Sequence, residues 1–212
     1  MAQIFGPGAS SWFRIALPAA LVAALALFVL DQSYVRASGW TRLGRPIEQP
    51  IPFSHEHHVG LIGLDCRYCH GSVETSAFAG MPSTSTCMNC HSQVWTDSPL
   101  LEPVRASWRT RTPIRWNRVH VLPDFVFFDH RPHVHAGVPC VECHGRVDRM
   151  PAISQVHPML MGWCLDCHRR PEGTRVAAAH EFDPAAQPGH DPNLPPLDVP
   201  AALLTRCNTC HR

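Results

Sequence analysis

Every cysteine of this chain belongs to one short motif that is repeated five times. The ten cysteines among the 212 residues form Cys-x-x-Cys pairs, and a histidine directly follows each pair. The pairs are Cys66 and Cys69, Cys87 and Cys90, Cys140 and Cys143, Cys164 and Cys167, and Cys207 and Cys210. The histidines that follow are His70, His91, His144, His168 and His211. We number the motifs from first to fifth in chain order.

The Cys-x-x-Cys-His motif is the attachment sequence of c-type haem. Its two thiols form thioethers to the porphyrin, and the adjacent histidine binds the iron as the proximal ligand. Zinc ribbons combine Cys-x-x-Cys pairs two by two and do not need the histidine. Disulfides within each pair also leave the five histidines unexplained, and a metal-free disulfide domain would be colourless. The sequence therefore predicts five haem c groups, held by the ten cysteines and the five motif histidines.

Two stretches of the chain resemble each other, and each contains two of the motifs. Each stretch begins with a Phe-x-His-x-x-His element, at Phe53 in the first copy and at Phe128 in the second. An iron that only transfers electrons needs a second, distal axial ligand. The predicted distal ligands in the two elements are His55, His58, His130 and His133. Histidines three positions apart on a helix share a face but diverge, which suits two different haems. This arrangement resembles that of small multihaem cytochromes of the c7 and c3 type.

The fifth distal ligand is open between one histidine and three methionines. The candidates are His120, Met150, Met159 and Met161. Methionine ligation raises the reduction potential relative to histidine, whereas a methionine that is not a ligand usually fills gaps in apolar contacts. The other histidines outside the motifs are interpreted as surface or hydrogen-bonding residues, namely His57, His135, His157, His180 and His190.

Composition indicates what fills the interior. The chain has 21 Pro and 13 Gly, and beyond its N-terminal region it lacks the periodic apolar pattern of a conventional core. We expect mainly short α-helices and irregular loops packed around five c-type haems, with c7- or c3-like haem pairs, preceded by one transmembrane helix. All 18 basic residues are arginine, which suits bidentate pairing with haem propionates. The formal net charge of +1 gives no indication of a nucleic-acid partner.

An apolar run near the N-terminus predicts a membrane anchor. Ile15–Leu30 is almost purely apolar, and Trp12 and Phe13 extend it as interfacial residues toward the length of a spanning helix. Pro18 is expected in the first turn of the apolar run, where proline is tolerated. A cleaved signal peptide is the alternative, but no small-x-small cleavage site follows the run directly. Haem c is attached outside the cytoplasm, so the haem domain is expected on the periplasmic face of the cytoplasmic membrane.

These features divide the chain into seven predicted segments. They are a cytoplasmic N-terminus (1–11), a transmembrane anchor (12–31), a linker (32–52), a first two-haem unit (53–95), a connecting or docking segment (96–127), a second two-haem unit (128–170), and a Pro-rich segment with the fifth haem (171–212).

Several stretches that extend beyond the motifs are similar to the pentahaem cytochrome c subunit of alternative complex III. They are residues 53–70, 79–95, 101–110, 114–130, 143–151 and 163–172. The resemblance implies a single-pass subunit that relays electrons from quinol to a periplasmic monohaem cytochrome c or a terminal oxidase. It also implies, as partners, an iron–sulfur subunit related to molybdopterin oxidoreductases and polytopic quinol-binding subunits. It implies no small-molecule substrate of the chain itself, which is then an electron-transfer subunit and not catalytic alone.

Two other functions share parts of this pattern. A multihaem reductase would need one iron with an open coordination position, often with lysine in place of the motif histidine, and the chain contains no lysine. A stand-alone multihaem quinol dehydrogenase has the same plan of one anchor and several haems. It differs from the relay subunit because the isolated chain would itself be reduced by quinol.

Overall fold

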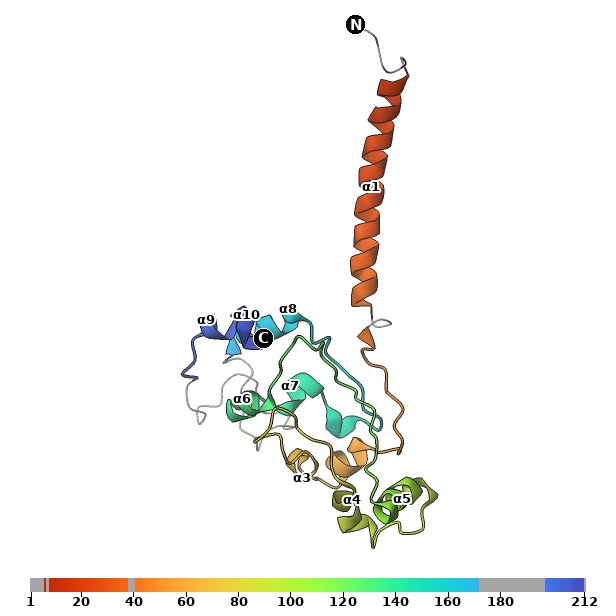
Figure 1. The fold of residues 1–212 in the computed structure, drawn as a ribbon, viewed down its shortest axis with the longest axis vertical. Coiled ribbons are helices and arrows are strands. Elements are labelled where there is room, and N and C mark those ends of the chain that lie inside the picture. The colour runs from red at the N-terminus through yellow and green to blue at the C-terminus, as the bar shows by residue number, and fades with distance from the viewer. Residues whose placement is uncertain (1–5, 7, 38–40, 172–196, 212) are drawn as a thin grey trace. The chain divides into compact units, whose positions relative to one another are not determined.

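The computed structural model describes residues 6, 8–37, 41–171 and 197–211. The described part of the chain is helical and contains no strand, as the predicted fold class requires (Figure 1). The chain divides into two units, Met1–Arg42 and Leu43–Arg212. Residues 172–196 of the predicted Pro-rich segment (171–212) lie outside the described residues, and His180 and His190 are among them.

The first unit is built on one long helix, α1 (Ala9–Arg36). Its stretch Ser11–Val35 has a mean hydropathy of 2.3 over its most apolar window and is long enough to cross a membrane. A signal sequence near the N-terminus meets the same criteria of length and composition. The prediction for Pro18 was wrong, because α1 begins nine residues earlier and Pro18 lies inside the helix. Proline there has no N–H to donate to the Arg14 carbonyl.

In the second unit, a short helix carries each of the five motifs, as predicted. These helices are α3 (Cys66–Cys69), α4 (Thr84–His91), α7 (Cys140–His144), α8 (Met161–His168) and α10 (Cys207–Cys210). Asp65 shows how such a short helix begins, since its carboxylate accepts a hydrogen bond from the Arg67 backbone N–H at 2.7 Å. A capping side chain of this kind satisfies an otherwise unpaired N–H of the first turn. A helical turn places both cysteines and the histidine of a motif close together.

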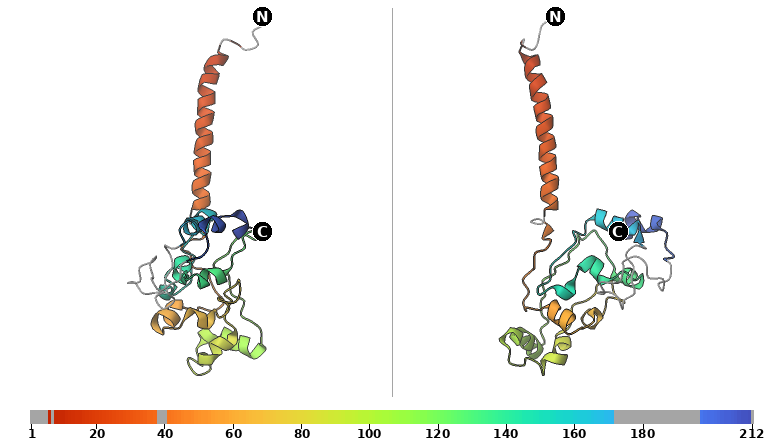
Figure 2. Two further views of the ribbon diagram at one scale, coloured as in Figure 1. Left: turned by 90° about the vertical axis from the view of Figure 1, so that its left-hand side faces the viewer. Right: turned by 180° about the vertical axis from the view of Figure 1, so that it is seen from behind.

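The remaining elements connect these motif helices. They are η1 (Glu56–Leu61, a π-helix), η2 (Pro99–Leu101, a 3-10 helix), α5 (Glu102–Thr110), α6 (His130–His135), η3 (Val147–Arg149, a 3-10 helix) and α9 (Ala201–Leu204). Pro132 lies in the first turn of α6, where its missing N–H costs no helical hydrogen bond. Figure 2 shows the same elements from two further directions.

Helix α5 lies in the segment for which the sequence suggested only a connection or a docking surface. It packs against α4, where the hydroxyls of Thr84 and Ser107 are 2.6 Å apart. Val104 and Ser107 are its buried residues, and Glu102 on its exposed side pairs with Arg105 and Arg109. The helix therefore supports the second motif.

The two repeated stretches meet where η1 packs against η3. The backbone N–H of Glu56 donates to the Met150 carbonyl at 3.1 Å. Gly60 lies so close to the Asp148 carbonyl that a Cβ at this position would clash with it. Only glycine permits this backbone contact, which holds the first distal-ligand element against the segment that follows the third motif.

Few hydrophobic side chains are buried in the described part of the second unit. They are Ile51, Val73 and Val104. Large apolar residues near the motifs are exposed instead, among them Tyr68, Phe78, Met81, Phe125 and Leu160. Three buried side chains cannot stabilise a unit of this size through the hydrophobic effect alone. This pattern fits a chain whose interior is completed by large covalently bound cofactors.

Candidate haem-binding sites

The two Phe-x-His-x-x-His elements have nearly the same geometry. In the first, the Phe53 ring stacks on His58 with centroids 4.3 Å apart and meets His55 edge-on at 4.8 Å. In the second, Phe128 stacks on His133 at 4.7 Å and meets His130 edge-on at 4.8 Å. In each element, therefore, one phenylalanine orients two imidazoles in different directions.

Backbone carbonyls orient most of the predicted ligand rings through their Nδ1 atoms. The Nδ1–carbonyl distances are 2.8 Å from His58 to Ser54, 2.8 Å from His130 to Ala77, 2.8 Å from His133 to Asp129, 2.7 Å from His70 to Gly80, 3.1 Å from His91 to Val94, 2.9 Å from His168 to Leu204 and 3.0 Å from His211 to Phe125. A carbonyl oxygen can only accept, so in each ring Nδ1 carries the proton. The Nε2 lone pair is then available for a metal, and the carbonyl is the outer partner that metal-binding histidines commonly have.

Three of the predicted distal histidines face a motif histidine across similar gaps. The ring centroids are 6.2 Å apart for His58 and His91, 6.4 Å for His130 and His144, and 6.0 Å for His133 and His168. Two imidazoles on opposite sides of one metal have centroids about 6 Å apart, because each metal–nitrogen bond is about 2 Å and each centroid lies about 1 Å beyond the nitrogen. The spacing of these pairs therefore fits an iron atom between each two rings.

His55 is left for the first motif. The residue is half-buried, and its Nδ1 atom is buried without a hydrogen-bond partner among the described residues. Burial, followed by the nearby charges of His70 and His58, lowers the pKa of His55 to about 4. Among the histidines, His70 of the first motif has the largest effect on this pKa. The neutral imidazole is in the form that binds a metal.

Burial acts in the same way on other rings of this group. It lowers the pKa of His144 to about 3, with the nearby His120 as the next cause, and it lowers the pKa values of His58 and His133. Desolvation disfavours the charged imidazolium. These rings are therefore neutral at physiological pH, as ligation of iron requires.

The structure places two of the candidates for the fifth distal ligand, His120 and Met150, at the third motif. The His120 ring lies 4.3 Å from that of His144, at the third motif, and burial lowers the pKa of His120. The side chain of Met150 lies beside Gly145, also at the third motif. Met161 begins α8 and is 67% exposed, and Met159 has a positive φ of 50°. His211 of the fifth motif contacts Phe125, and its distal ligand stays a prediction.

The described cysteines are free thiols, not disulfides. Burial raises the pKa of Cys143 to about 12, with Cys167 as the next cause. In the part of the chain that the structure describes, no group of three or more His, Cys, Asp or Glu side chains could hold a metal ion. The histidines come together mainly in twos, which is what axial ligation on two sides of a porphyrin needs.

Sequence reasoning identified the histidines but missed the groups that orient them. The two phenylalanines begin the same element in both copies, so the repeat itself indicated them. The accepting carbonyls could not be found in this way, because every residue has one. Three are far away in sequence from their histidines, namely Ala77 for His130, Leu204 for His168 and Phe125 for His211.

Replacing Phe128 with alanine is expected to loosen His133 and His130 without removing either. We expect the free energy of unfolding to fall by about 1 kcal/mol, the usual contribution of an aromatic pair. The low-spin ferric spectrum of the holoprotein should broaden for one or two haems. Urea unfolding and low-temperature EPR measure both effects. Phe127→Ala is the matched control, since its half-exposed ring precedes the element; equal effects of the two variants would contradict the orienting role.

Comparison with known proteins gives one related sequence. No family model matches the chain. Over 98 residues it is 40% identical to a protein of Nitratidesulfovibrio vulgaris named "Menaquinone reductase, multiheme cytochrome c subunit". The match covers 46% of this chain and 46% of that protein, so the chain spans about half the length of the curated relative. The similarity supports a multihaem cytochrome c subunit and does not distinguish alternative complex III from other membrane oxidoreductases.

Proposed function

We propose that this chain is a membrane-anchored pentahaem cytochrome c that relays electrons within a respiratory quinol-oxidising complex of the alternative complex III type. The main supporting observation is the set of histidine pairs about 6 Å apart, each joining a predicted distal ligand to a motif histidine. The similarity to a multihaem cytochrome c subunit supports the same class of protein.

The chain's own residues would bind and orient the cofactors. Haem c, when bound, carries one electron by alternating between ferric and ferrous iron. The ten cysteines would attach the five porphyrins, and the motif histidines would bind the irons from one side. His55, His58, His130 and His133 would bind four of the irons from the other side, in the pairs described above. Carbonyls on Nδ1 hold the rings in place, so little has to move when an electron arrives.

The proposed complex supplies what this chain lacks. In it, polytopic subunits bind quinol, an iron–sulfur subunit related to molybdopterin oxidoreductases delivers electrons, and a monohaem cytochrome c or a terminal oxidase accepts them. Helix α1 would hold the haem unit on the periplasmic face of the cytoplasmic membrane. We retain the predicted segment boundaries in this proposal, with two-haem units at 53–95 and 128–170.

A second candidate function is electron transfer in the opposite direction, toward a quinone. The name of the related protein favours it, because that protein is called a menaquinone reductase. Nothing in a bis-histidine relay sets the direction, which depends on the potentials of its two partners. Both functions use the same residues of this chain.

Anaerobic addition of quinol separates these functions. The native complex, extracted in mild detergent, and the isolated chain are each mixed with quinol while the haem α-band is followed. We expect rapid reduction of the complex only, together with co-purifying polytopic and iron–sulfur subunits. Equally fast reduction of the isolated chain would indicate a stand-alone quinol dehydrogenase. Reduction of quinone by the complex, with quinol inactive, would indicate the reverse direction.

The mature protein is expected to keep α1. Its mass should equal that of the whole chain plus five haems, and the protein should stay in the membrane fraction after a high-salt wash. Ile15–Leu30 can remain in the bilayer because no cleavage site follows it directly. Intact-mass spectrometry of the purified protein measures this. A mature chain that begins after residue 31 would show that α1 is a cleaved signal sequence.

A further inference from the structure

We infer that the five haems lie in the spatial order second, first, third, fourth, fifth, so that the second haem and not the first ends the series. Haems are numbered here by their motifs. The inference rests on the proposed haem content and adds the path that electrons take through the chain. It follows from which ligand-bearing segments contact each other.

The first and second haems are neighbours. Their distal ligands, His55 and His58, are three residues apart and share one phenylalanine. The motif helices α3 and α4 also adjoin, because the Asn89 side-chain amide donates to the Tyr68 hydroxyl at 3.0 Å. These contacts place the two haems side by side but do not decide which of them faces the second repeat.

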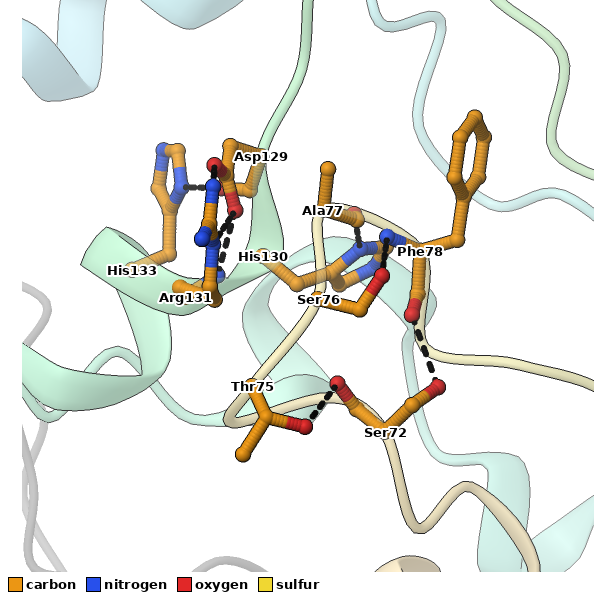
Figure 3. Close-up of polar contacts among 9 residues, drawn as sticks. All are labelled: Ser72, Thr75, Ser76, Ala77, Phe78, Asp129, His130, Arg131 and His133. Atoms are coloured by element: carbon orange, nitrogen blue, oxygen red, sulfur yellow. Dashed lines mark hydrogen bonds and ion pairs between the residues drawn. The ribbon is translucent and has the colours of Figure 1, made fainter.

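The first haem, not the second, adjoins the third. His130 is the predicted ligand that faces the third motif. Figure 3 shows the hydrogen bond between its Nδ1 and the Ala77 carbonyl. Ala77 lies in the loop that leaves the first motif, in which Ser72 accepts from Thr75 and donates to the Phe78 carbonyl. The loop is therefore folded back on the first motif. The packing of η1 against η3 also joins the first repeated stretch to the second.

The third, fourth and fifth haems continue the series. His130 and His133 lie three residues apart on α6 and face the third and fourth motif histidines respectively. Nδ1 of His168, in the fourth motif, is hydrogen-bonded to the Leu204 carbonyl at 2.9 Å. Leu204 lies in α9, just before the fifth motif. The fourth haem is thus joined to the third through α6 and to the fifth through α9.

The arrangement of the helices agrees with this order. In the views of Figures 1 and 2, α4 and α5 lie at one end of the second unit and α8, α9 and α10 at the other, with α3, α6 and α7 between them. Each step along the series would oxidise one ferrous haem iron and reduce the next ferric one, with no bond made and no proton moved. The ends available to partners are the second haem, near the exposed Trp95, and the fifth haem.

Two variants of η1 test the order in the holoprotein. His58→Met and His55→Met each give one haem, the second or the first, a methionine ligand and so a raised potential. At a potential where only that haem is reduced, its low-spin ferrous iron is diamagnetic. The ferric haems beside it have then lost a paramagnetic neighbour and relax more slowly, and low-temperature EPR counts them. We expect one neighbour for His58→Met and two for His55→Met. The control His57→Met should give no early-reduced haem.

The opposite result, two neighbours for His58→Met and one for His55→Met, would overturn the inference, since it is what sequence order requires. If neither variant accumulates, the iron positions in a cryo-electron microscopy map of the wild-type complex decide the question. An iron of the first haem between the second and third supports the order, and an iron of the second haem between the first and third contradicts it. Haem content by mass spectrometry, measured beforehand, tests the proposed function separately.

Discussion

Serine at both Cys140 and Cys143 is expected to remove one haem from the middle of the chain and to abolish electron transfer from quinol to the acceptor. In the proposed function these two thiols would form the covalent attachment of the third haem. His130 and His144, whose rings are 6.4 Å apart, would then face each other without an iron between them. Because this haem links the two repeated stretches, the haems on either side would be too far apart to exchange electrons.

Intact mass and the quinol-driven rate measure the two effects of this variant together. The mass should correspond to one haem fewer, and the rate should fall to that of a membrane without the complex. Glu142→Gln is the control, because residue 142 lies between the two cysteines and is not itself an attachment point. It should keep five haems and the full rate. A Cys140→Ser, Cys143→Ser variant that still carries five haems would show that the third motif does not bind haem.

Methionine in place of His133 is expected to raise the potential of the fourth haem alone. His133 is half-buried, stacks on Phe128 and faces His168, with ring centroids 6.0 Å apart. We expect an increase on the order of 0.1 V, a part of the roughly 0.8 V over which axial ligands can set the potential of haem. The raised haem would trap the electron, so the rate through the complex should fall while all five haems are retained.

A potentiometric titration followed at the α-band measures this shift. His135→Met is the matched control, since His135 lies two residues further along α6 and is exposed. It should leave every potential within experimental error. A shift with His135→Met, or none with His133→Met, would show that α6 presents a different histidine to the iron.

The covalent chemistry of this protein is local in sequence, so the sequence alone predicted it. Two cysteines and a histidine within five residues are sufficient for haem attachment, and a run such as Ile15–Leu30 needs only its own length to indicate a membrane helix. The Phe-x-His-x-x-His elements were identified because they are repeated. Because each motif is short and local in sequence, a helical turn at each of them could also be predicted. The helices α3, α4, α7, α8 and α10 confirm this prediction.

Only the tertiary structure showed which histidines face each other, and the inferred order of the haems rests on those contacts. His58 and His91 are separated by 33 residues in sequence and by 6.2 Å between ring centroids. Ala77 reaches His130 in the other repeat. Such contacts depend on how η1 packs on η3, where Gly60 permits an approach that any Cβ would block. The sequence therefore predicted how each haem would be attached. The proposed axial pairs and the inferred order of the haems came only from long-range contacts, because a distance across the fold is not encoded by spacing along the chain.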